Sequence, residues 1–382
     1  MGNQSLVKRA APEGGQRRAA GSRARGLRAT IGRAVLGPRL DELECELDHQ
    51  RQVSAAWKAK ARDLKAEVQE KAHAVLSPDV LRLLLPGRLE RARHLSAMPD
   101  ARARHEAHMR GCLPYREAIL AERVPSERAA PATIEGVRWW VPMDPRYPDR
   151  LSRVVGQGLP LRILLRTREI ALGGSMIDIG ANIGRTSIPR VVMGDVSLAY
   201  AAEPDPDNFA CLARTVADNG LLGLVMPEHT AVGSTDGEIE LTHARFIGGH
   251  AIRPASRRGA ETTRVPVRRL DTWVRERAID LDLLTFVKVD VQGWEPHVLL
   301  GAPQVLAKAH VSWQLEVDPG QLEAAGGSAE DLFALIEQSF GHFIDLHPDV
   351  RGPRVLPVSR LRETLGYLGD KSHKTDLVLI HG

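Results

Sequence analysis

The sequence predicts an α/β fold in which helices cover both faces of a doubly wound, mostly parallel sheet. After residue 131, short apolar segments alternate with amphipathic segments of about ten to fifteen residues, a pattern typical of strands followed by helices. Only 4% of the 382 residues are aromatic, so the core must consist mainly of Val, Leu, Ile and Ala. These residues are common in parallel strands that are buried on both faces.

The apolar segments after residue 131 give the expected strands in order. They are 175–179, 197–202, 224–232, 284–291, 311–317 and a final run at 376–381. An earlier segment, 136–142, predicts a further strand that covers one end of the same domain, which we place at 131–382. A helix running through 187–192 follows the first of the sheet strands.

The chain before residue 131 divides into three parts by composition. Residues 1–39 contain nine basic residues and a single acid, Glu13, without hydrophobic periodicity, which predicts a disordered basic tail. Residues 40–76 have apolar positions at alternating steps of four and three, which predicts a long helix. That helix could form a coiled coil and a homo-oligomer through 43–75, or pack on its own domain, since polar residues interrupt the seam. Residues 77–130 predict a helical extension and linker.

Charge and cysteine content exclude several classes of protein. The net charge of +4 is smaller than the excess charge of the tail, so the rest of the chain is net negative, and we expect no nucleic acid on the catalytic domain. The three cysteines lie far apart without metal-ligand spacing, which fits a reducing, cytoplasmic location. No apolar run approaches the roughly 18 residues of a transmembrane segment, and the start lacks the apolar core of a secretory signal.

The first candidate binding element is the loop 178–184, Asp-Ile-Gly-Ala-Asn-Ile-Gly, which follows an apolar strand and leads into a helix. Ligands of open parallel sheets bind at the carboxyl ends of the strands. Gly180 and Gly184 would permit a tight turn and a close approach of the backbone to a ligand. Asp178 could accept hydrogen bonds from a cationic or hydroxylated ligand.

The second candidate is Glu203, which ends the next strand and could accept both ribose hydroxyls of an adenosine. A dinucleotide site would need Gly-x-Gly-x-x-Gly for the pyrophosphate. Here the turn has an acid, Asp178, two places before its first glycine, which would repel a pyrophosphate and suit the amino group of a methionine moiety. S-adenosylmethionine is therefore the predicted cofactor. An NAD(P) site, and a turn without any ligand, stay open as alternatives.

The third candidate is the strand end from Lys288 to Glu295. Strand periodicity places Phe286, Lys288 and Asp290 on one face. Asp290 would then share the crevice with the first two elements and could orient an attacking hydroxyl or accept its proton. Lys288 and Asp290 could equally form a structural ion pair.

A fourth acid, Glu316, follows another strand. Together with Asp290 and Glu295 it could hold a hard cation, although the spacing leaves any metal unassigned. Histidine titrates near neutral pH, so three histidines are secondary candidates for a general base, although surface or capping roles are commoner. They are His229, His297 and His347.

The segment 136–382 resembles the FkbM family of methyltransferases. An ordered set of motifs carries the resemblance: 177–184, 202–206, 230–233 with a hairpin at 237–242, 269–272 and 287–302. One position departs, because Gln292 stands where the family usually has Glu, so the resemblance does not extend to a charged role at that place.

The resemblance implies a seven-stranded Rossmann-like methyltransferase sheet whose last strand is antiparallel. It also implies methyl transfer from S-adenosylmethionine to a hydroxyl of a sugar, glycan or small natural product. The implied cofactor residues are Asp178, Gly180, Ala181, Asn182, Gly184 and Glu203, and the implied catalytic residues are Lys288, Asp290 and Glu295.

Two other functions stay open: an NAD(P)-dependent oxidoreductase, and a non-catalytic scaffold that uses the N-terminal helix and the basic tail. Acceptor specificity is expected in 142–150, 246–258 and 345–354, because these segments are irregular, rich in Pro and Gly, and expected to surround the crevice.

Overall fold

The computed structural model describes most of the chain after residue 128. The described ranges are 129–134, 137–143, 150–157, 159–171, 173–243, 251–252, 262–350, 354–369 and 373–381. The predicted basic tail 1–39, the predicted helix 40–76 and the extension up to residue 128 lie outside the described residues, so these parts remain predictions.

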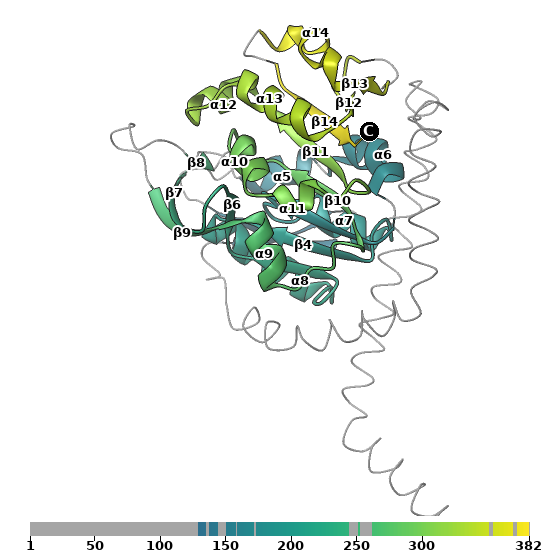
Figure 1. Ribbon diagram of the computed structural model, residues 1–382. Coiled ribbons are helices and arrows are strands. Elements are labelled where there is room, and N and C mark those ends of the chain that lie inside the picture. Colours follow the sequence, from purple (N-terminus) through teal and green to yellow (C-terminus); the bar gives the residue numbers. More distant parts are fainter. Residues whose placement is uncertain are drawn as a thin grey trace, which may run out of the picture. The chain divides into compact units, whose positions relative to one another are not determined.

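An eight-stranded sheet forms the centre of the described fold (Figure 1). Its spatial order is β13-β12-β14-β11-β10-β3-β4-β5. The bounds are β3 Ser175–Ile179, β4 Leu198–Ala202, β5 Val225–Glu228, β10 Leu284–Val289, β11 Ser312–Val317, β12 His342–Asp345, β13 Leu356–Pro357 and β14 Thr375–Ile380. Strands β11, β10, β3, β4 and β5 are parallel, whereas β14 pairs antiparallel with both β11 and β12. The expected antiparallel last strand is thus confirmed.

The expected number of seven strands is one short of the eight observed, because the two-residue strand β13 pairs with β12 at the edge. The order of strands along the chain reverses between β3 and β10: β4 and β5 extend the sheet to one side, and β11 extends it to the other. In open α/β sheets this is the place where ligands bind.

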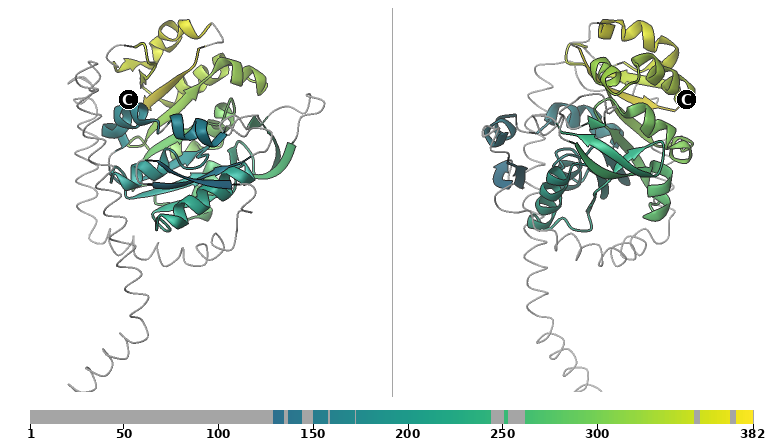
Figure 2. Two further views of the ribbon diagram at one scale, coloured as in Figure 1. Left: turned by 180° about the vertical axis from the view of Figure 1, so that it is seen from behind. Right: turned by 90° about the vertical axis from the view of Figure 1, so that its left-hand side faces the viewer.

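Helices cover both faces of the sheet, as two views from other directions also show (Figure 2). One hydrophobic cluster contains Phe286 of β10 and packs under helices α5 Arg150–Gln157, α6 Leu161–Ala171, α7 Ser187–Val192 and α8 Pro206–Asp218. The other contains Val287 and Val289 and packs under α9 Leu270–Glu276, α10 Glu295–Leu300, α11 Pro303–Leu306, α12 Pro319–Ala324, α13 Ala329–Ser339 and α14 Leu361–Thr364. Short 3₁₀ turns η1 Val358–Arg360 and η2 Gly366–Gly369 flank α14. The alternation of side chains along β10 therefore builds two cores, and the doubly wound prediction is confirmed.

The strand predicted at 136–142 is β2, Val137–Pro142, which pairs with β1, Ala129–Ile134, in a separate antiparallel hairpin. The hairpin packs on α8. The backbone N–H of Trp140 donates to Thr215 Oγ1 at 2.9 Å, and the side-chain amide of Asn219 bonds both the N–H and the carbonyl of Arg138. The hairpin thus covers a helix of the domain.

A second sheet, of four strands in the order β6-β9-β7-β8, lies between β5 and β10 in the chain. Its strands are β6 Ala231–Gly233, β7 Gly237–Thr242, β8 Ala251–Ile252 and β9 Thr262–Arg269. The single strand predicted at 224–232 is wrong: it is divided between β5 and β6, because Thr230 breaks the strand and its hydroxyl bonds the Pro266 carbonyl beside β6. The hairpin predicted at 237–242 is one strand, β7, whose antiparallel partner is β9.

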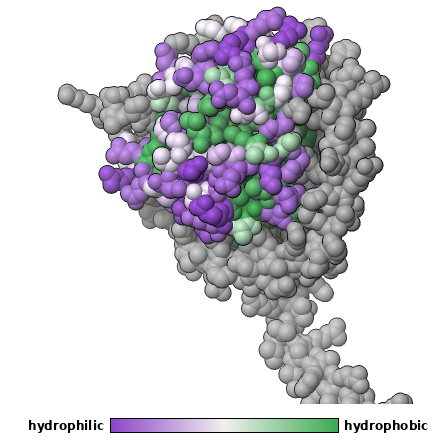
Figure 3. Space-filling model, in the orientation of Figure 1, coloured by the Kyte–Doolittle hydropathy of each residue, from purple (hydrophilic) through white to green (hydrophobic). Residues whose placement is uncertain are grey.

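The surface shows little large apolar area in the described part. Val155 and Leu300 are its markedly exposed large apolar side chains, at 44% and 53%. On the face in Figure 3, hydrophobic residues (green) form a central patch bordered by polar ones (purple). Among the described residues, no helix has the length and apolar character that crossing a bilayer requires.

Candidate active site

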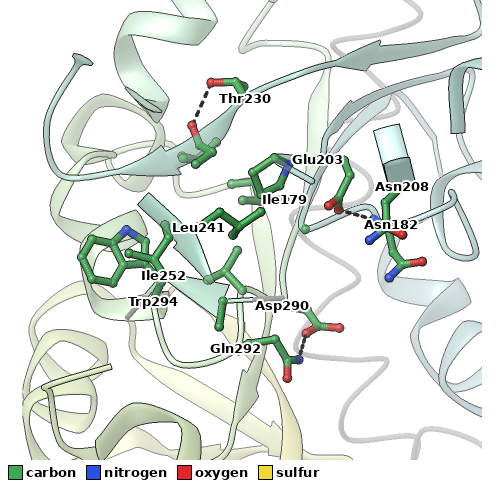
Figure 4. Close-up of a pocket in the computed structure, with 16 residues that line it drawn as sticks. Ile179, Asn182, Glu203, Asn208, Thr230, Leu241, Ile252, Asp290, Gln292 and Trp294 are labelled. Atoms are coloured by element: carbon green, nitrogen blue, oxygen red, sulfur yellow. Dashed lines mark hydrogen bonds between the residues drawn. The ribbon is translucent and has the colours of Figure 1, made fainter. Parts of the chain in front are cut away.

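A cavity lies at the carboxyl ends of β3, β4 and β10, beside the second sheet (Figure 4). It encloses about 600 Å³ of empty space, part of it open to solvent. The cavity is lined by Ile179, Gly180, Asn182, Glu203, Pro204, Asn208, Thr230, Ala231, Val232, Leu241, Ala251, Ile252, Asp290, Val291, Gln292 and Trp294.

The loop after β3 is fastened to the end of β4 by its backbone. The N–H groups of Gly180 and Ala181 both donate to the carbonyl of Ala202, at 3.0 and 2.9 Å. Asn182 has a positive φ of 54°, and its N–H donates to Glu203 Oε2 at 2.7 Å. Gly180 and Asn182 line the cavity, whereas Ala181 is buried in the core and supports the loop from behind.

The two glycines of the loop serve packing within the protein. A Cβ on Gly180, at φ 75°, would lie 1.9 Å from the carbonyl oxygen of Asp290. A Cβ on Gly184, at φ 90°, would lie 2.6 Å from Ile188 Cδ1 and 2.7 Å from Leu212 Cδ1. The expectation that both glycines leave room for a ligand therefore changes: Gly180 lets two strand ends meet, and Gly184 lets α7 and α8 pack.

Gly180→Ala is expected to destabilise the protein by about 2–4 kcal/mol, because strain at positive φ adds to the clash with the Asp290 carbonyl. Urea unfolding measures the change. Gly366→Ala is the matched control, since a Cβ there meets nothing within 4 Å. Equal midpoints for the two variants would contradict the proposed close approach.

Glu203 is the acid that β4 delivers to the cavity. The residue is 4% exposed, and its second oxygen, Oε1, accepts from the N–H of Asp205 at 2.9 Å. Asp205 in turn caps α8 by accepting from the N–H of Asn208, which brings Asn208 to the cavity wall. Burial, together with the charge of Asp205, raises the pKa of Glu203 to about 8.

Asp178 lies behind the cavity. The residue is fully buried, and its Oδ2 accepts from the N–H of Ser187 at 3.1 Å. Its Oδ1 lies 3.3 Å from the ammonium of Lys288, the residue opposite it on β10. Asp178 therefore does not line the cavity, and its contacts hold the start of α7 and Lys288 in place; the ligand contact expected for it stays a prediction.

Lys288 is a buried bridge between strand ends. Its ammonium donates to the Gly180 carbonyl at 2.9 Å and lies 3.4 Å from Asp290 Oδ2. Burial acts against its charged form, but the carboxylates of Asp178 and Asp290 outweigh burial and raise the pKa of Lys288. A charged ammonium donates hydrogen bonds and does not accept a proton, so the contacts of Lys288 suit the positioning of other groups; the catalytic role expected for it stays a prediction. The structural ion pair considered as the alternative is present.

Asp290 faces the cavity just beyond the end of β10. Its N–H donates to the Ile179 carbonyl at 3.1 Å, which fixes it beside β3. Burial favours the neutral acid, but the nearby ammonium of Lys288 and a hydrogen bond from Gln292 lower the pKa of Asp290. An ionised carboxylate therefore faces the cavity at neutral pH.

Glu295 does not line the cavity. It is 1% exposed, and its Oε1 accepts from the N–H groups of Val291 at 3.0 Å and Gly293 at 3.3 Å. Burial raises the pKa of Glu295 to about 7. These contacts shape the loop between β10 and α10, and the catalytic role expected for Glu295 stays a prediction.

The acids expected to form a cation site with Glu295 are not gathered around one point. Among the described residues, no group of three or more His, Cys, Asp or Glu side chains is arranged to hold a metal ion. The reason is that the Glu295 carboxylate accepts hydrogen bonds from backbone N–H groups of its own loop and does not join Asp290 and Glu316.

The three candidate histidines lie outside the cavity lining. His229 Nε2 is 3.0 Å from the Pro204 carbonyl, and His297 stacks on Trp294 with ring centroids 3.6 Å apart. His347 lies beside Tyr367, with ring centroids 5.0 Å apart. Of these residues and Asp290, only Asp290 lines the cavity, so it is the better candidate for proton transfer.

Several cavity residues were not predicted. The second sheet supplies Leu241, Ala251 and Ile252, and the loop after β10 supplies Trp294. The alternation of the apolar residues Ile239 and Leu241 with polar neighbours along β7 was the available signal in the sequence, together with the segment at 230–233. Of the segments expected to determine specificity, Ala251 and Ile252 do line the cavity, whereas 144–149, 246–250, 253–258 and 351–353 lie outside the described residues.

Residues 178–346 match the family model described as the methyltransferase FkbM domain. The chain carries an FkbM domain. The matched segment includes the loop after β3, Glu203, the second sheet and the strand end with Asp290, so every residue that lines the cavity belongs to the FkbM domain. The hairpin β1–β2 and the strand β14 lie outside the match.

Comparison with solved structures gives three similar chains. The first is an FkbM methyltransferase from Methylobacillus flagellatus KT, with 17% identity and a TM-score of 0.33 over 70% of this chain and 58% of that one. A putative transferase from Pyrococcus horikoshii has 11% identity and a TM-score of 0.29 over 67% and 74%. The m1A22 tRNA methyltransferase TrmK of B. subtilis has 12% identity and a TM-score of 0.30 over 57% and 65%. The chain thus spans less than two thirds of the first of these structures, and comparison with curated proteins gives no match.

Proposed function

We propose that the FkbM domain binds S-adenosylmethionine and transfers its methyl group to a hydroxyl oxygen of a sugar, a glycan or a small natural product. One observation carries the proposal: Glu203 and Asp290, from the ends of β4 and β10, face one cavity on either side of the loop after β3. Their opposite shifts in pKa suit two different tasks, one in binding and one in orienting a reacting hydroxyl.

The donor set of the cavity fits the adenosine part of the cofactor. The two backbone N–H groups that bond Glu203 fix the plane of its carboxylate. A carboxylate has about four lone-pair sites, so both oxygens retain capacity for the two ribose hydroxyls. The side chains of Asn182 and Asn208 lie beside Glu203, and the apolar residues Ala231 and Ile252 offer surface for a base.

The cofactor would supply a methyl group on a sulfonium sulfur, which leaves as the neutral thioether of S-adenosylhomocysteine, so positioning of the acceptor is the main task of the protein. Asp290 holds the acceptor hydroxyl and accepts its proton as the oxygen is methylated. Its ionised state, maintained by Lys288, suits that task. Asp178 does not contact the acceptor, and it affects Asp290 only by holding the ammonium of Lys288 in place.

Titration calorimetry on the full chain tests the proposal. S-adenosylmethionine and S-adenosylhomocysteine are expected to bind with one site per chain, and NAD⁺ and NADP⁺ are expected to give no heat of binding. Incubation with methyl-labelled cofactor and a cell extract should then label a product that mass spectrometry identifies as an O-methyl compound. Binding of NAD⁺ alone by folded protein would instead support the oxidoreductase alternative.

A further inference from the structure

A continuous row of charged and polar side chains crosses the floor of the cavity and continues to the surface. From Lys288, whose ammonium is 3.4 Å from Asp290 Oδ2, it passes to Gln292, whose Nε2 donates to Asp290 Oδ1 at 2.8 Å. The same Nε2 donates to Glu316 Oε2 at 2.9 Å, and Glu316 Oε1 lies 2.6 Å from the ammonium of Lys374. Figure 4 shows Gln292 beside Asp290 at the cavity.

The chemistry of the row fixes the orientation of the Gln292 amide. The ionised Asp290 carboxylate only accepts hydrogen bonds, so the nitrogen of the amide, with its two hydrogens, must face Asp290, and the same nitrogen donates to Glu316 Oε2. Each carboxylate thereby has one oxygen on a lysine and the other on Gln292. Lys288 is shared between Asp178 and Asp290, and Lys374 lies on Glu316. Burial, together with the charge of Asp290, raises the pKa of Glu316 to about 9, so Glu316 adds little negative charge beside Asp290 at neutral pH.

Three features of the loop hold Gln292 in this position. Its backbone has a φ of 56°, which is uncommon for a residue other than glycine. A Cβ on the next residue, Gly293, would lie 2.2 Å from the Gln321 carbonyl oxygen, so only glycine fits there. Glu295 accepts from the N–H groups on both sides of Gln292. The loop is therefore shaped to present this side chain between the two acids.

We propose that Gln292 is a positioning residue, whose amide holds the Asp290 carboxylate in the cavity and occupies the place that a divalent cation would take between Asp290 and Glu316. The role of Asp290 in this statement rests on the proposed function. The replacement of the cation by an amide does not, because it concerns only the contacts among these side chains. A carboxylate at position 292 would remove both donors and leave three acids facing one another, a set of oxygen ligands that attracts a hard cation.

Titration of the full chain with Mn²⁺ tests this inference without any cofactor or acceptor. Calorimetry and electron paramagnetic resonance of free Mn²⁺ report the binding. The wild type is expected to show no site that depends on Glu316, whereas Gln292→Glu is expected to bind one Mn²⁺ on the order of tenfold or more tighter. The double variant Gln292→Glu with Glu316→Gln should lose the gain.

Lys374→Met is the second variant, and because the Lys374 side chain is 58% exposed, the variant is expected to fold, which circular dichroism checks. It removes the nearest exposed positive charge but leaves the amide in place, so it is expected to bind no Mn²⁺. Mn²⁺ binding by Lys374→Met would overturn the inference, because repulsion by the lysine would then explain an empty site. A Glu316-dependent site in the wild type would overturn it too, as would a folded Gln292→Glu variant without any gain.

Discussion

Glu203→Ala is expected to weaken the binding of S-adenosylhomocysteine on the order of a hundredfold. The variant removes an acceptor for two ribose hydroxyls, and hydrogen bonds to a charged group contribute about 1.5–3 kcal/mol each. It also releases the N–H groups of Asn182 and Asp205, which the carboxylate now bonds. Titration calorimetry on the full chain measures the loss.

The matched control is Glu240→Ala, which removes an exposed acid from β7, the strand that supplies Leu241 to the cavity. The affinity of Glu240→Ala for S-adenosylhomocysteine is expected to equal that of the wild type. Similar losses in both variants, or none in Glu203→Ala, would remove Glu203 from the binding site.

The raised pKa of Glu203 adds a dependence on pH. Because the free protein holds this carboxyl with a pKa of about 8, the group is mostly protonated at pH 7 and must lose its proton to accept both hydroxyls. Affinity should therefore rise with pH by up to about tenfold per unit below pH 8, and level off above it. Glu203→Gln should bind weakly with a flat profile between pH 6 and 8. A wild-type affinity that falls as pH rises would contradict this assignment.

Lys288→Met is expected to lower the free energy of unfolding by about 3–5 kcal/mol, because it leaves the fully buried carboxylate of Asp178 without its counter-ion. The variant also removes the hydrogen bond to the Gly180 carbonyl and with it one support of the loop after β3. Urea unfolding of the full chain, followed by near-ultraviolet circular dichroism, measures the effect.

Two variants control this prediction. Lys308→Met breaks the exposed ion pair with Asp282 and is expected to cost less than about 1 kcal/mol. The double variant Lys288→Met with Asp178→Asn should recover part of the loss, since no unpaired charge then remains in the core. A Lys288→Met protein as stable as Lys308→Met would show that the pair contributes little.

The positions of the strand ends could be predicted because they depend on local patterns. The apolar runs before Asp178 and Glu203 mark buried strands, and the acids that follow them must emerge at one edge of a parallel sheet. The same rule applies to Asp290 after β10, and the three acids do lie in one region of the fold.

Local patterns do not decide which of these acids faces the cavity. Asp178 and Asp290 both follow the same rule, but Asp178 lies opposite Lys288 in the register of β3 and β10 and is therefore held in the core. Asp290 comes after the end of β10 and remains accessible. The register between strands more than a hundred residues apart decides the difference, and no short segment of sequence contains it.

The second sheet was missed for a related reason. Its strand β8 has only two residues, and β6 has three, so neither gives a hydrophobic period that a strand prediction could use. The parallel pairing of β6 with β9 joins segments on either side of the whole hairpin region. Such pairing is specified by contacts across the fold.

The separation of the two sheets has a consequence for protein engineering. The second sheet is inserted between β5 and β10 and shares no strand with the eight-stranded sheet in the described part of the chain. Leu241 and Ile252 therefore shape the cavity without taking part in the register that holds Glu203 and Asp290. Libraries of variants at these two positions can alter the range of accepted molecules while the architecture of the main sheet is conserved.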